Sequence, residues 1–305
     1  MLSVVEAEVM RQPAALKSLA GQRFGLAPAG SVFVGAGDSF AASSIACRLS
    51  SAGHVVLNPY ELISAPAFTR GKSVYFVSVS GMTASNVAAA KAVKGLAKER
   101  TAITADAGGR LAEATDSTIP IPYGFVPRLP GTLSFSLSLL TLLKLAGDNF
   151  SCDFSQIHSM AEHHVSRVLI SERKLTHFLG NSAAYPTSLY SALKLHEFLG
   201  VPAQACMLEE FAHANLFALN SNDTVNIFCA FDPLGFGEKL ASSLNRKGFR
   251  ASAITPVGSN PWELVFYFVF LSQFAALKGA KLKRLSRPYF ALARKKLTIS
   301  DSLIY

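Results

Sequence analysis

A carboxylate, an amine and an imidazole lie close together in the second half of the sequence. Tyr190, Lys194 and Glu197 fall at positions i, i+4 and i+7 of a predicted helix and share one stripe of it. His213 follows after a short predicted strand, where a second helix begins. A carboxylate and an imidazole on neighbouring elements can move protons near neutral pH. The alternatives are an ordinary exposed ion pair between Lys194 and Glu197, and a core histidine at position 213.

Small and hydroxyl-bearing residues follow two predicted strands of the first half. One turn is Gly35-Ala36-Gly37-Asp38-Ser39 and the other runs from Ser78 to Thr83. Each turn leads into a helix N-terminus, where free N–H groups and the helix dipole favour an anion such as phosphate. Ordinary helix caps are the alternative reading of the same residues. The first turn does not complete the GxGxxG pattern of dinucleotide sites, because Phe40 stands at its last position.

Strands and helices alternate along the chain, which predicts two α/β sandwiches in tandem. Each has a parallel sheet flanked by helices, in residues 1–150 and 151–305. In the first half we expect strands at 31–37, 54–58, 73–81, 101–106 and 117–122, with helices at 3–20, 38–53, 82–99 and 131–147. In the second we expect strands at 175–181, 203–208, 225–231 and 249–256, with helices at 186–199, 235–248 and 262–277. Ligands of such sheets bind beyond the carboxyl ends of the strands.

Composition indicates a globular protein with enough residues for two cores. The chain has 305 residues, of which 50% are apolar and 16% are charged, with a net charge of +9. The basic residues concentrate near the C-terminus without an aromatic-rich nucleic-acid motif, so we expect no nucleic-acid partner. Four scattered cysteines suggest neither a zinc site nor a disulfide framework, and fit a reducing cytosol. The most apolar run, 264–277, is too short for a membrane span, and no signal-peptide core is present.

Several motifs resemble those of double SIS (sugar isomerase) proteins, in the same order nearly end to end. In the first half these are EVMRQPAAL, VGAGDSF, SVSGMTAS and ITADAGGRLAEATD. In the second half they are ALKLHE, EEFAH and SRPYFALARKKLT. The chain is similar to the isomerase part of glucosamine-6-phosphate synthase, to stand-alone aminosugar-phosphate deaminases and isomerases, and to phosphoglucose/phosphomannose isomerases of archaeal type. The resemblance implies a flavodoxin-like three-layer sandwich in each half.

The resemblance also implies roles for individual residues. Glu197 would move a proton between C1 and C2 of the sugar, Lys194 would support the linear sugar or an imine, and His213 would help open the ring. In this family the histidine often comes from the partner subunit, so we expect a homodimer. No metal or organic cofactor is expected. Phosphosugar contacts are implied for Gly37, Ser39, Ser78, Ser80, Thr83, Thr132, Ser134 and Lys295, and for Arg128 in the phosphoglucose/phosphomannose branch.

Four positions depart from the aminosugar pattern. Val79 stands where a glutamine is usual, and Asp38 stands where a threonine or serine is usual. His196 replaces a lysine beside the expected base, and Ala214 begins a replacement of Gly-Pro after His213. A carboxylate close to a phosphate repels it unless it turns away. These departures leave open whether the chain is catalytic.

Three functions therefore remain under consideration. The first is a cytosolic enzyme that acts on a phosphorylated hexose or aminohexose by isomerisation, with or without loss of ammonia, and deamination of glucosamine 6-phosphate is the foremost reaction. The second is a phosphoglucose or phosphomannose isomerase, for which the segment 126–130 would supply Arg128. The third is a phosphosugar-binding regulator without catalysis. The sequence does not name the sugar or the direction of the reaction.

Overall fold

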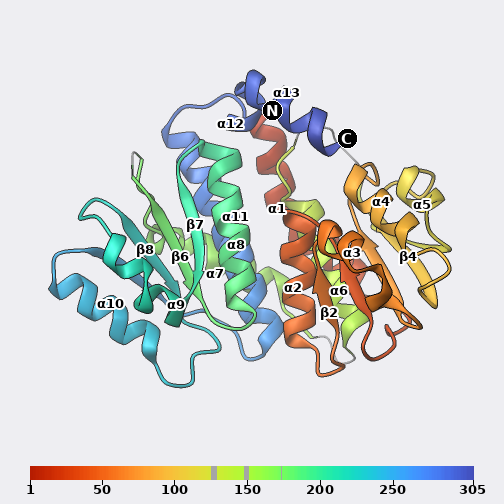
Figure 1. The fold of residues 1–305 in the computed structure, drawn as a ribbon. Helices are drawn as coiled ribbons and strands as arrows, with labels where there is room; N and C mark the ends of the chain where they lie inside the picture. The colour runs from red at the N-terminus through yellow and green to blue at the C-terminus, as the bar shows by residue number, and fades with distance from the viewer. Residues whose placement is uncertain (125–128, 148–150, 173) are drawn as a thin grey trace. The chain divides into compact units, whose positions relative to one another are not determined.

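The computed structural model describes residues 1–124, 129–147, 151–172 and 174–305. By contacts between backbone positions the chain forms two compact units. Unit 1 comprises Met1–Pro13 and Ser151–Ala293, and unit 2 comprises Ala14–Phe150 and Arg294–Tyr305. Each chain end therefore belongs to the unit built mainly from the opposite half of the sequence. Each unit contains one parallel sheet (Figure 1).

Unit 2 is a five-stranded parallel sheet of order β2-β1-β3-β4-β5. Its elements are the end of α1 (Leu2–Ala20), β1 (Val32–Val34), α2 (Asp38–Leu49), β2 (Val55–Leu57), α3 (Pro59–Ser64), η1 (Pro66–Thr69), β3 (Ser73–Val77), α4 (Ala84–Ala92), β4 (Glu99–Thr104), α5 (Arg110–Glu113), β5 (Ser117–Pro120), α6 (Leu133–Ala146) and α13 (Arg294–Ile304).

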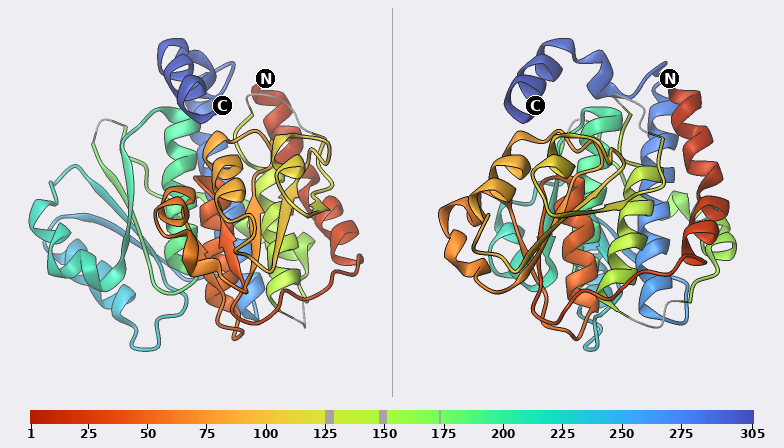
Figure 2. Two further views of the ribbon diagram at one scale, coloured as in Figure 1. Left: turned by 45° about the vertical axis from the view of Figure 1, so that its right-hand side comes forward. Right: turned by 90° about the vertical axis from the view of Figure 1, so that its right-hand side faces the viewer.

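Helices cover both faces of this sheet (Figure 2). On one face α2 packs against α6, and on the other α3 packs against α4. The strands β1 and β3 are buried along their whole length, as expected for the centre of a parallel sheet with two covered faces. Small residues such as Ala89 and Ala90 in α4 let that helix approach the sheet closely.

Unit 1 is a four-stranded parallel sheet of order β7-β6-β8-β9. Its longest helix, α11, packs against α7 and α8 on one face, and α10 packs on β8 and β9. The elements are the start of α1, α7 (Phe154–His163), η2 (Val165–Arg167), β6 (Thr176–Gly180), α8 (Ala184–Leu199), β7 (Ala203–Met207), α9 (Leu208–His213), η3 (Asn215–Ala218), β8 (Thr224–Phe228), α10 (Phe236–Arg246), β9 (Arg250–Ile254), α11 (Pro261–Leu282) and α12 (Tyr289–Leu292).

The first part of α1 runs antiparallel to α11 within unit 1. The amide of Leu2 donates to the carbonyl of Ser286, Lys281 pairs with Glu6, and Gln12 bonds Gln273. In the part of the chain that the structure describes, α11 is the one helix long and apolar enough to cross a membrane, and 78% of its apolar window is buried. Core helices of soluble proteins have the same properties, which agrees with the buried helix expected from the sequence.

The expected α/β fold with two parallel sheets flanked by helices is confirmed. The helix expected at 82–99 is shorter, because α4 ends at Ala92. Gly95 lies just beyond it with a φ of 78°, a left-handed conformation that stops a helix and that glycine adopts without strain. The short helices α3, α5 and α12 were not expected from periodicity, because each has too few turns to show one.

The burial of the His54 ring leads to a testable prediction about the pH dependence of stability. Neither ring nitrogen has a hydrogen-bond partner among the described residues, the ring packs edge-on against Phe33, and burial lowers the pKa of His54. The unfolded chain therefore binds a proton more readily, so stability falls as pH drops below the usual histidine pKa of about 6.5. We expect His54→Phe to raise the free energy of unfolding by about 1 kcal/mol at pH 7, and by more at pH 5.

Urea unfolding of wild type and His54→Phe between pH 7.5 and 5 measures this effect, because this range includes the unperturbed histidine pKa of about 6.5. His163→Gln is the matched control, because His163 is an exposed histidine. If the free energy of unfolding changes with pH equally steeply in wild type and in His54→Phe, the prediction is wrong.

Candidate functional site

The turn after β3 presents hydroxyl groups at the start of α4. The side chain of Ser78 is buried, and its Oγ lies 3.1 Å from Oγ1 of Thr83. Thr83 is the N-cap residue of α4, yet its side chain makes no capping hydrogen bond. An ordinary helix cap therefore does not explain Thr83. Hydroxyls beside the N-terminus of a nine-residue helix form a suitable environment for an anion.

The same turn is held in place by the end of β4. Gly81 has a φ of 64°, and a Cβ at this position would lie 3.0 Å from Oγ1 of Thr104. That hydroxyl donates to the carbonyl of Val79 and accepts from the amide of Asp106, while the amide of Leu111 donates to the carbonyl of Gly81. The hydroxyl-bearing turn is thus a fixed structure and needs glycine at position 81.

The turn after β1 is equally tight. A Cβ on Gly35 would lie 2.9 Å from the backbone carbon of Ser39, so only glycine fits there. Gly37 is exposed and has a φ of 55°, and the amide of Ser39 donates to the carbonyl of Ala36. Asp38 and Ser39 are partly buried in the first turn of α2. Glycine at positions 35 and 37 therefore brings the helix N-terminus close to the end of β1.

The strand order brings both turns to one edge of the unit 2 sheet. Strand β1 lies between β2 and β3, and Val34 pairs with Phe76, so the two strands end at nearly the same level. After β1 the chain crosses to β2 on one side, whereas after β3 it crosses to β4 on the opposite side. The direction of the crossovers therefore reverses between β1 and β3, which makes this a topological switch point. Ligands of open parallel sheets bind at such points. Gly37 and Ser39 after β1, and Ser78, Ser80 and Thr83 after β3, therefore lie at the same edge of the sheet.

The start of α6 lies near the start of α2. The hydroxyl of Ser50, just after α2, donates to the carbonyl of Ala146 at the end of α6. Because α2 and α6 pack together and have similar lengths, their beginnings are also neighbours. Thr132 caps α6 in sequence and is fully buried, and Ser134 is 7% exposed. Both predicted contacts therefore lie at the same edge as the turns, within the protein rather than on its surface.

The two other predicted contacts of unit 2 have different outcomes. Arg128 lies outside the described residues. Lys295 is exposed on α13, a helix without buried side chains. The end of this helix is tethered to α5, because Nη1 of Arg110 donates to the carbonyl of Tyr305 at 3.2 Å. Since α5 follows β4, the tether lies on the carboxyl side of the sheet, where the hydroxyl-bearing turns are.

Unit 1 repeats the backbone of these turns but not their side chains. A Cβ on Gly180 would lie 2.6 Å from the backbone of Ala184, and Ser182 has a φ of 46°, as at Gly35 and Gly37. After β8, however, Oδ2 of Asp232 accepts the amide of Gly237 in the first turn of α10 at 2.7 Å. A carboxylate already satisfies that helix start and would repel a phosphate. Of the turn after β3 in unit 2 and the turn after β8 in unit 1, the one in unit 2 is therefore suited to binding a phosphate.

The expected catalytic pair in unit 1 is not a surface ion pair. Lys194 has no exposed area, and its Nζ donates to Oε2 of Glu197 at 2.5 Å. The Glu197 side chain is 29% exposed, so the carboxylate is held by the buried ammonium and still reaches solvent. Nζ of Lys194 also lies 5.0 Å from the centre of the Tyr190 ring. A buried lysine is costly unless partner groups compensate for the water that its ammonium has lost. This requirement distinguishes Lys194 from the lysine of an ordinary exposed ion pair.

His213 lies on the protein surface at the end of α9. Its side chain is 73% exposed, and Nε2 is 3.8 Å from Oε1 of Glu209, which is itself 82% exposed. This excludes a core histidine. The imidazole pairs with Glu209 and not with Glu197, and a pair this exposed contributes little to stability. The ring is accessible to another molecule.

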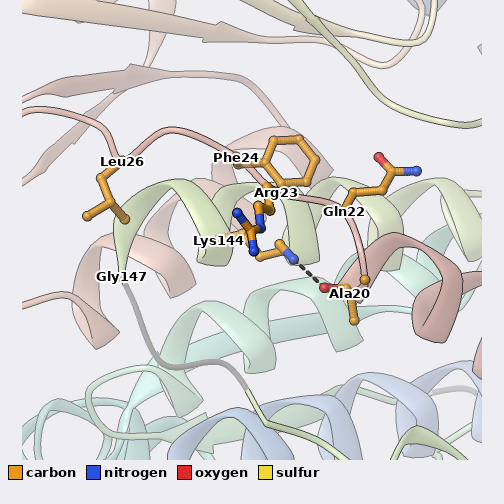
Figure 3. Close-up of a pocket in the computed structure, with 8 residues that line it drawn as sticks. Ala20, Gln22, Arg23, Phe24, Leu26, Lys144 and Gly147 are labelled. Atoms are coloured by element: carbon orange, nitrogen blue, oxygen red, sulfur yellow. Dashed lines mark hydrogen bonds between the residues drawn. The ribbon is translucent and has the colours of Figure 1, made fainter.

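A shallow depression of about 340 Å³ in unit 2 is not part of this site (Figure 3). Nζ of Lys144 donates there to the carbonyl of Ala20 at the end of α1, and lies 5.5 Å from the ring centre of Phe24. Burial lowers the pKa of Lys144. A lysine that satisfies a helix C-terminus is a structural feature. The depression is at the C-terminal end of α6, opposite the end that carries Thr132.

The described residues contain no group of three or more histidine, cysteine, aspartate or glutamate side chains that could hold a metal ion.

Comparisons with known proteins show the fold. No family model and no curated protein sequence matches the chain. Glucosamine-6-phosphate deaminase from Thermotoga maritima has a TM-score of 0.75 and 21% identity, over 93% of this chain and 95% of that one. Tagatose-6-phosphate ketose/aldose isomerase from Escherichia coli has a TM-score of 0.71 and 15% identity, covering 94% and 96%. The C-terminal domain of glucosamine-fructose-6-phosphate aminotransferase from Francisella tularensis has a TM-score of 0.71 and 16% identity, covering 93% and 97%. The chain thus has the fold of phosphosugar isomerases.

The sequence analysis assigned no role to two residues that hold the hydroxyl-bearing turn after β3 in place. Thr104 carries the turn after β3, and Nδ2 of Asn86 donates to the carbonyl of Val77 at the end of that strand. A hydroxyl at the last position of β4 was the available signal for Thr104. Nothing in the sequence indicates that Asn86 reaches back to the strand.

Removing the hydroxyl of Thr83 tests whether the turn after β3 binds phosphate. We expect Thr83→Val to raise the Kd for fructose 6-phosphate and for inorganic phosphate by roughly tenfold or more, because a hydrogen bond to a charged group contributes about 1.5–3 kcal/mol. Calorimetric titration measures both ligands. Thr118→Val, in β5 and outside the turns, is the control. Equal affinities in the two variants would remove Thr83 from the binding site.

Proposed function

We propose that the chain is an enzyme that isomerises a phosphorylated hexose or aminohexose. The observation that supports this most strongly is the pairing of buried Lys194 with partly exposed Glu197, in a chain whose unit 2 has hydroxyl-bearing turns at its switch point. An aldose–ketose shift needs one carboxylate that serves two adjacent carbons, and positive charge near the oxygens. The phosphosugar enzymes of the same fold support this reading.

In the proposed mechanism unit 2 binds the phosphate. Its oxygens accept hydrogen bonds from Ser78, Ser80 and Thr83, with Ser39 nearby, and from the free N–H groups at the start of α4. Thr132 and Ser134 contribute contacts from the start of α6. Because these groups bind the phosphate, they set affinity more than the rate of proton transfer.

Glu197 and Lys194 are the groups proposed for proton transfer. Glu197 takes the proton from one of the carbons C1 and C2 and returns it to the other. The Lys194 ammonium stabilises the negative charge that develops on the sugar in between. With open-chain glucosamine 6-phosphate, the C2 proton moves to C1 and a proton from the nitrogen moves to O1, so the C1 aldehyde becomes an alcohol and the C2 amine becomes an imine. Water then adds to this carbon, ammonia leaves, and fructose 6-phosphate is the product.

His213 would assist ring opening, and its exposure suits action in the site of a second copy of the chain. A homodimer with shared sites is therefore part of the proposal. Glucosamine-6-phosphate deamination is the preferred reaction, since the Thermotoga maritima deaminase shares the fold over 93% of this chain. The tagatose-6-phosphate isomerase has the same fold and supports the alternative, an ammonia-independent aldose–ketose isomerase.

A non-catalytic phosphosugar-binding protein is the alternative of another class. Asp38 in the first turn of α2 and Val79 in the hydroxyl-bearing turn favour it, because each replaces a neutral polar group that the resemblance implies. Thermal stabilisation by phosphosugars without turnover of any of them would support this alternative.

Replacing the proposed base tests the function. We expect Glu197→Gln to lower kcat for glucosamine 6-phosphate by about 10²–10⁴-fold, because the amide cannot accept the proton. The Kd for the phosphosugar should change little, since the phosphate groups are untouched. A coupled assay of fructose 6-phosphate formation measures kcat, and the reverse reaction with and without ammonium separates deamination from isomerisation.

The matched control is Glu162→Gln, an exposed glutamate on α7 outside the site. Wild-type rates in Glu197→Gln would remove Glu197 from the mechanism. Absence of turnover by the wild-type protein with glucosamine, glucose, mannose and tagatose 6-phosphates would overturn the proposal that the chain is an enzyme of this class.

A further inference from the structure

Lys194 belongs to a fully buried set of polar side chains in unit 1. Tyr190 lies one turn before it on α8, and two glutamines come from other helices, Gln12 from α1 and Gln273 from α11. All four side chains have no exposed area. Glu197 pairs with Lys194 but is not one of these four, because its side chain is partly exposed to solvent. Buried polar groups are costly unless they are hydrogen-bonded, and a satisfied network fixes the positions of its members.

Two hydrogen bonds of this set link α1 through α11 to α8, and in each the donor lies on the α1 side. Nε2 of Gln12 donates to Oε1 of Gln273, and Nε2 of Gln273 donates to Oη of Tyr190 at 2.9 Å. The amide of Gln273 is thus bonded through both its oxygen and its nitrogen. It cannot exchange these two atoms without losing both bonds.

The consequence concerns the aromatic ring. Anchoring Oη of Tyr190 fixes the far end of a side chain that has only two rotatable bonds. Nζ of Lys194 lies 5.0 Å from the centre of this ring, within the range of a cation–π contact. A lysine has a long flexible stem, so the ring on one side and the Glu197 carboxylate on the other both restrict where its ammonium lies.

We propose that Gln273, held by Gln12, is a positioning residue for the Lys194–Glu197 pair, and that it acts through the ring of Tyr190. This rests on the proposed function, because it assigns the pair to proton transfer. Proton transfer depends on sub-ångström placement of the base, whereas phosphate binding in unit 2 does not involve these residues. The start of α1 thereby contributes to catalysis without touching the substrate.

The chain offers a matched control for a merely structural role. Ser191 and Ser272 are the sequence neighbours of Tyr190 and Gln273, and they join the same two helices. Their hydroxyls lie 2.6 Å apart and are buried. Ser272→Ala therefore removes one buried side-chain hydrogen bond between α8 and α11 and leaves the ring of Tyr190 anchored. Gln273→Met also removes one bond between these helices, and in addition it removes the bond from Gln12.

The first measurement is steady-state kinetics of Gln273→Met and Ser272→Ala with glucosamine 6-phosphate. Gln273→Met should lower kcat by roughly ten- to a hundredfold with KM nearly unchanged, whereas Ser272→Ala should keep the wild-type kcat. Gln12→Met should act in the same direction as Gln273→Met, and provides a second variant if the latter does not fold. Equal kcat values in Gln273→Met, Gln12→Met and Ser272→Ala would overturn the proposal.

The second measurement does not depend on turnover. In carbon-13 lysine-labelled protein, the ε-methylene signal of Lys194, assigned by its loss in Lys194→Met, should be displaced by the ring current of Tyr190. Gln273→Met should move this signal toward the position of exposed lysines, and Ser272→Ala should leave it in place. An unmoved signal in Gln273→Met refutes the positioning role. A moved signal in a protein that converts no phosphosugar instead refutes the proposed function and retains the positioning of Lys194.

Discussion

The buried ammonium of Lys194 is the group on which the proposed chemistry depends. A lysine without exposed area is stable only where the surrounding groups compensate for the water it has lost. Glu197 supplies the opposite charge and the Tyr190 ring supplies an aromatic face. Because the carboxylate reaches solvent while the ammonium does not, the pair keeps one reactive group accessible and holds it from behind. An exposed pair with the same sequence spacing would be mobile and screened by water.

In unit 2, the N-cap side chain of α4 leaves the start of this helix without a side-chain cap among the described residues. Thr83 stands at the N-cap of α4, but its hydroxyl faces Ser78 and does not cap the helix. In unit 1 the equivalent helix start is satisfied by Asp232, which accepts the amide of Gly237. The two units therefore share the backbone of their first turns, at Gly35 and Gly180, and differ in the second. In the proposed function this difference assigns phosphate binding to the turns of unit 2 and proton transfer to Lys194 and Glu197.

The resemblance and the structure agree on the fold, and they leave different parts of the function to experiment. The fold is that of phosphosugar isomerases over more than nine-tenths of the chain, at identities of 21% and below. At such identities the side chains of the site carry the functional argument. Lys194, Glu197, Ser78 and Thr83 favour catalysis on a phosphosugar, and Asp38 and Val79 bear on which sugar is accepted.

The sequence by itself determined the alternation of strands and helices, the parallel sheets and the hydroxyl-bearing turns, because periodicity and glycine spacing are local properties. It placed Lys194 and Glu197 on one stripe of α8 but did not decide whether that stripe was buried. Only the tertiary structure decided this, since α11 covers α8 and brings Gln273 to Tyr190 from 83 positions away. The same holds for His213, whose exposure at the end of α9 no local pattern encodes. Burial depends on which elements pack together, and a short stretch of sequence does not specify its distant neighbours.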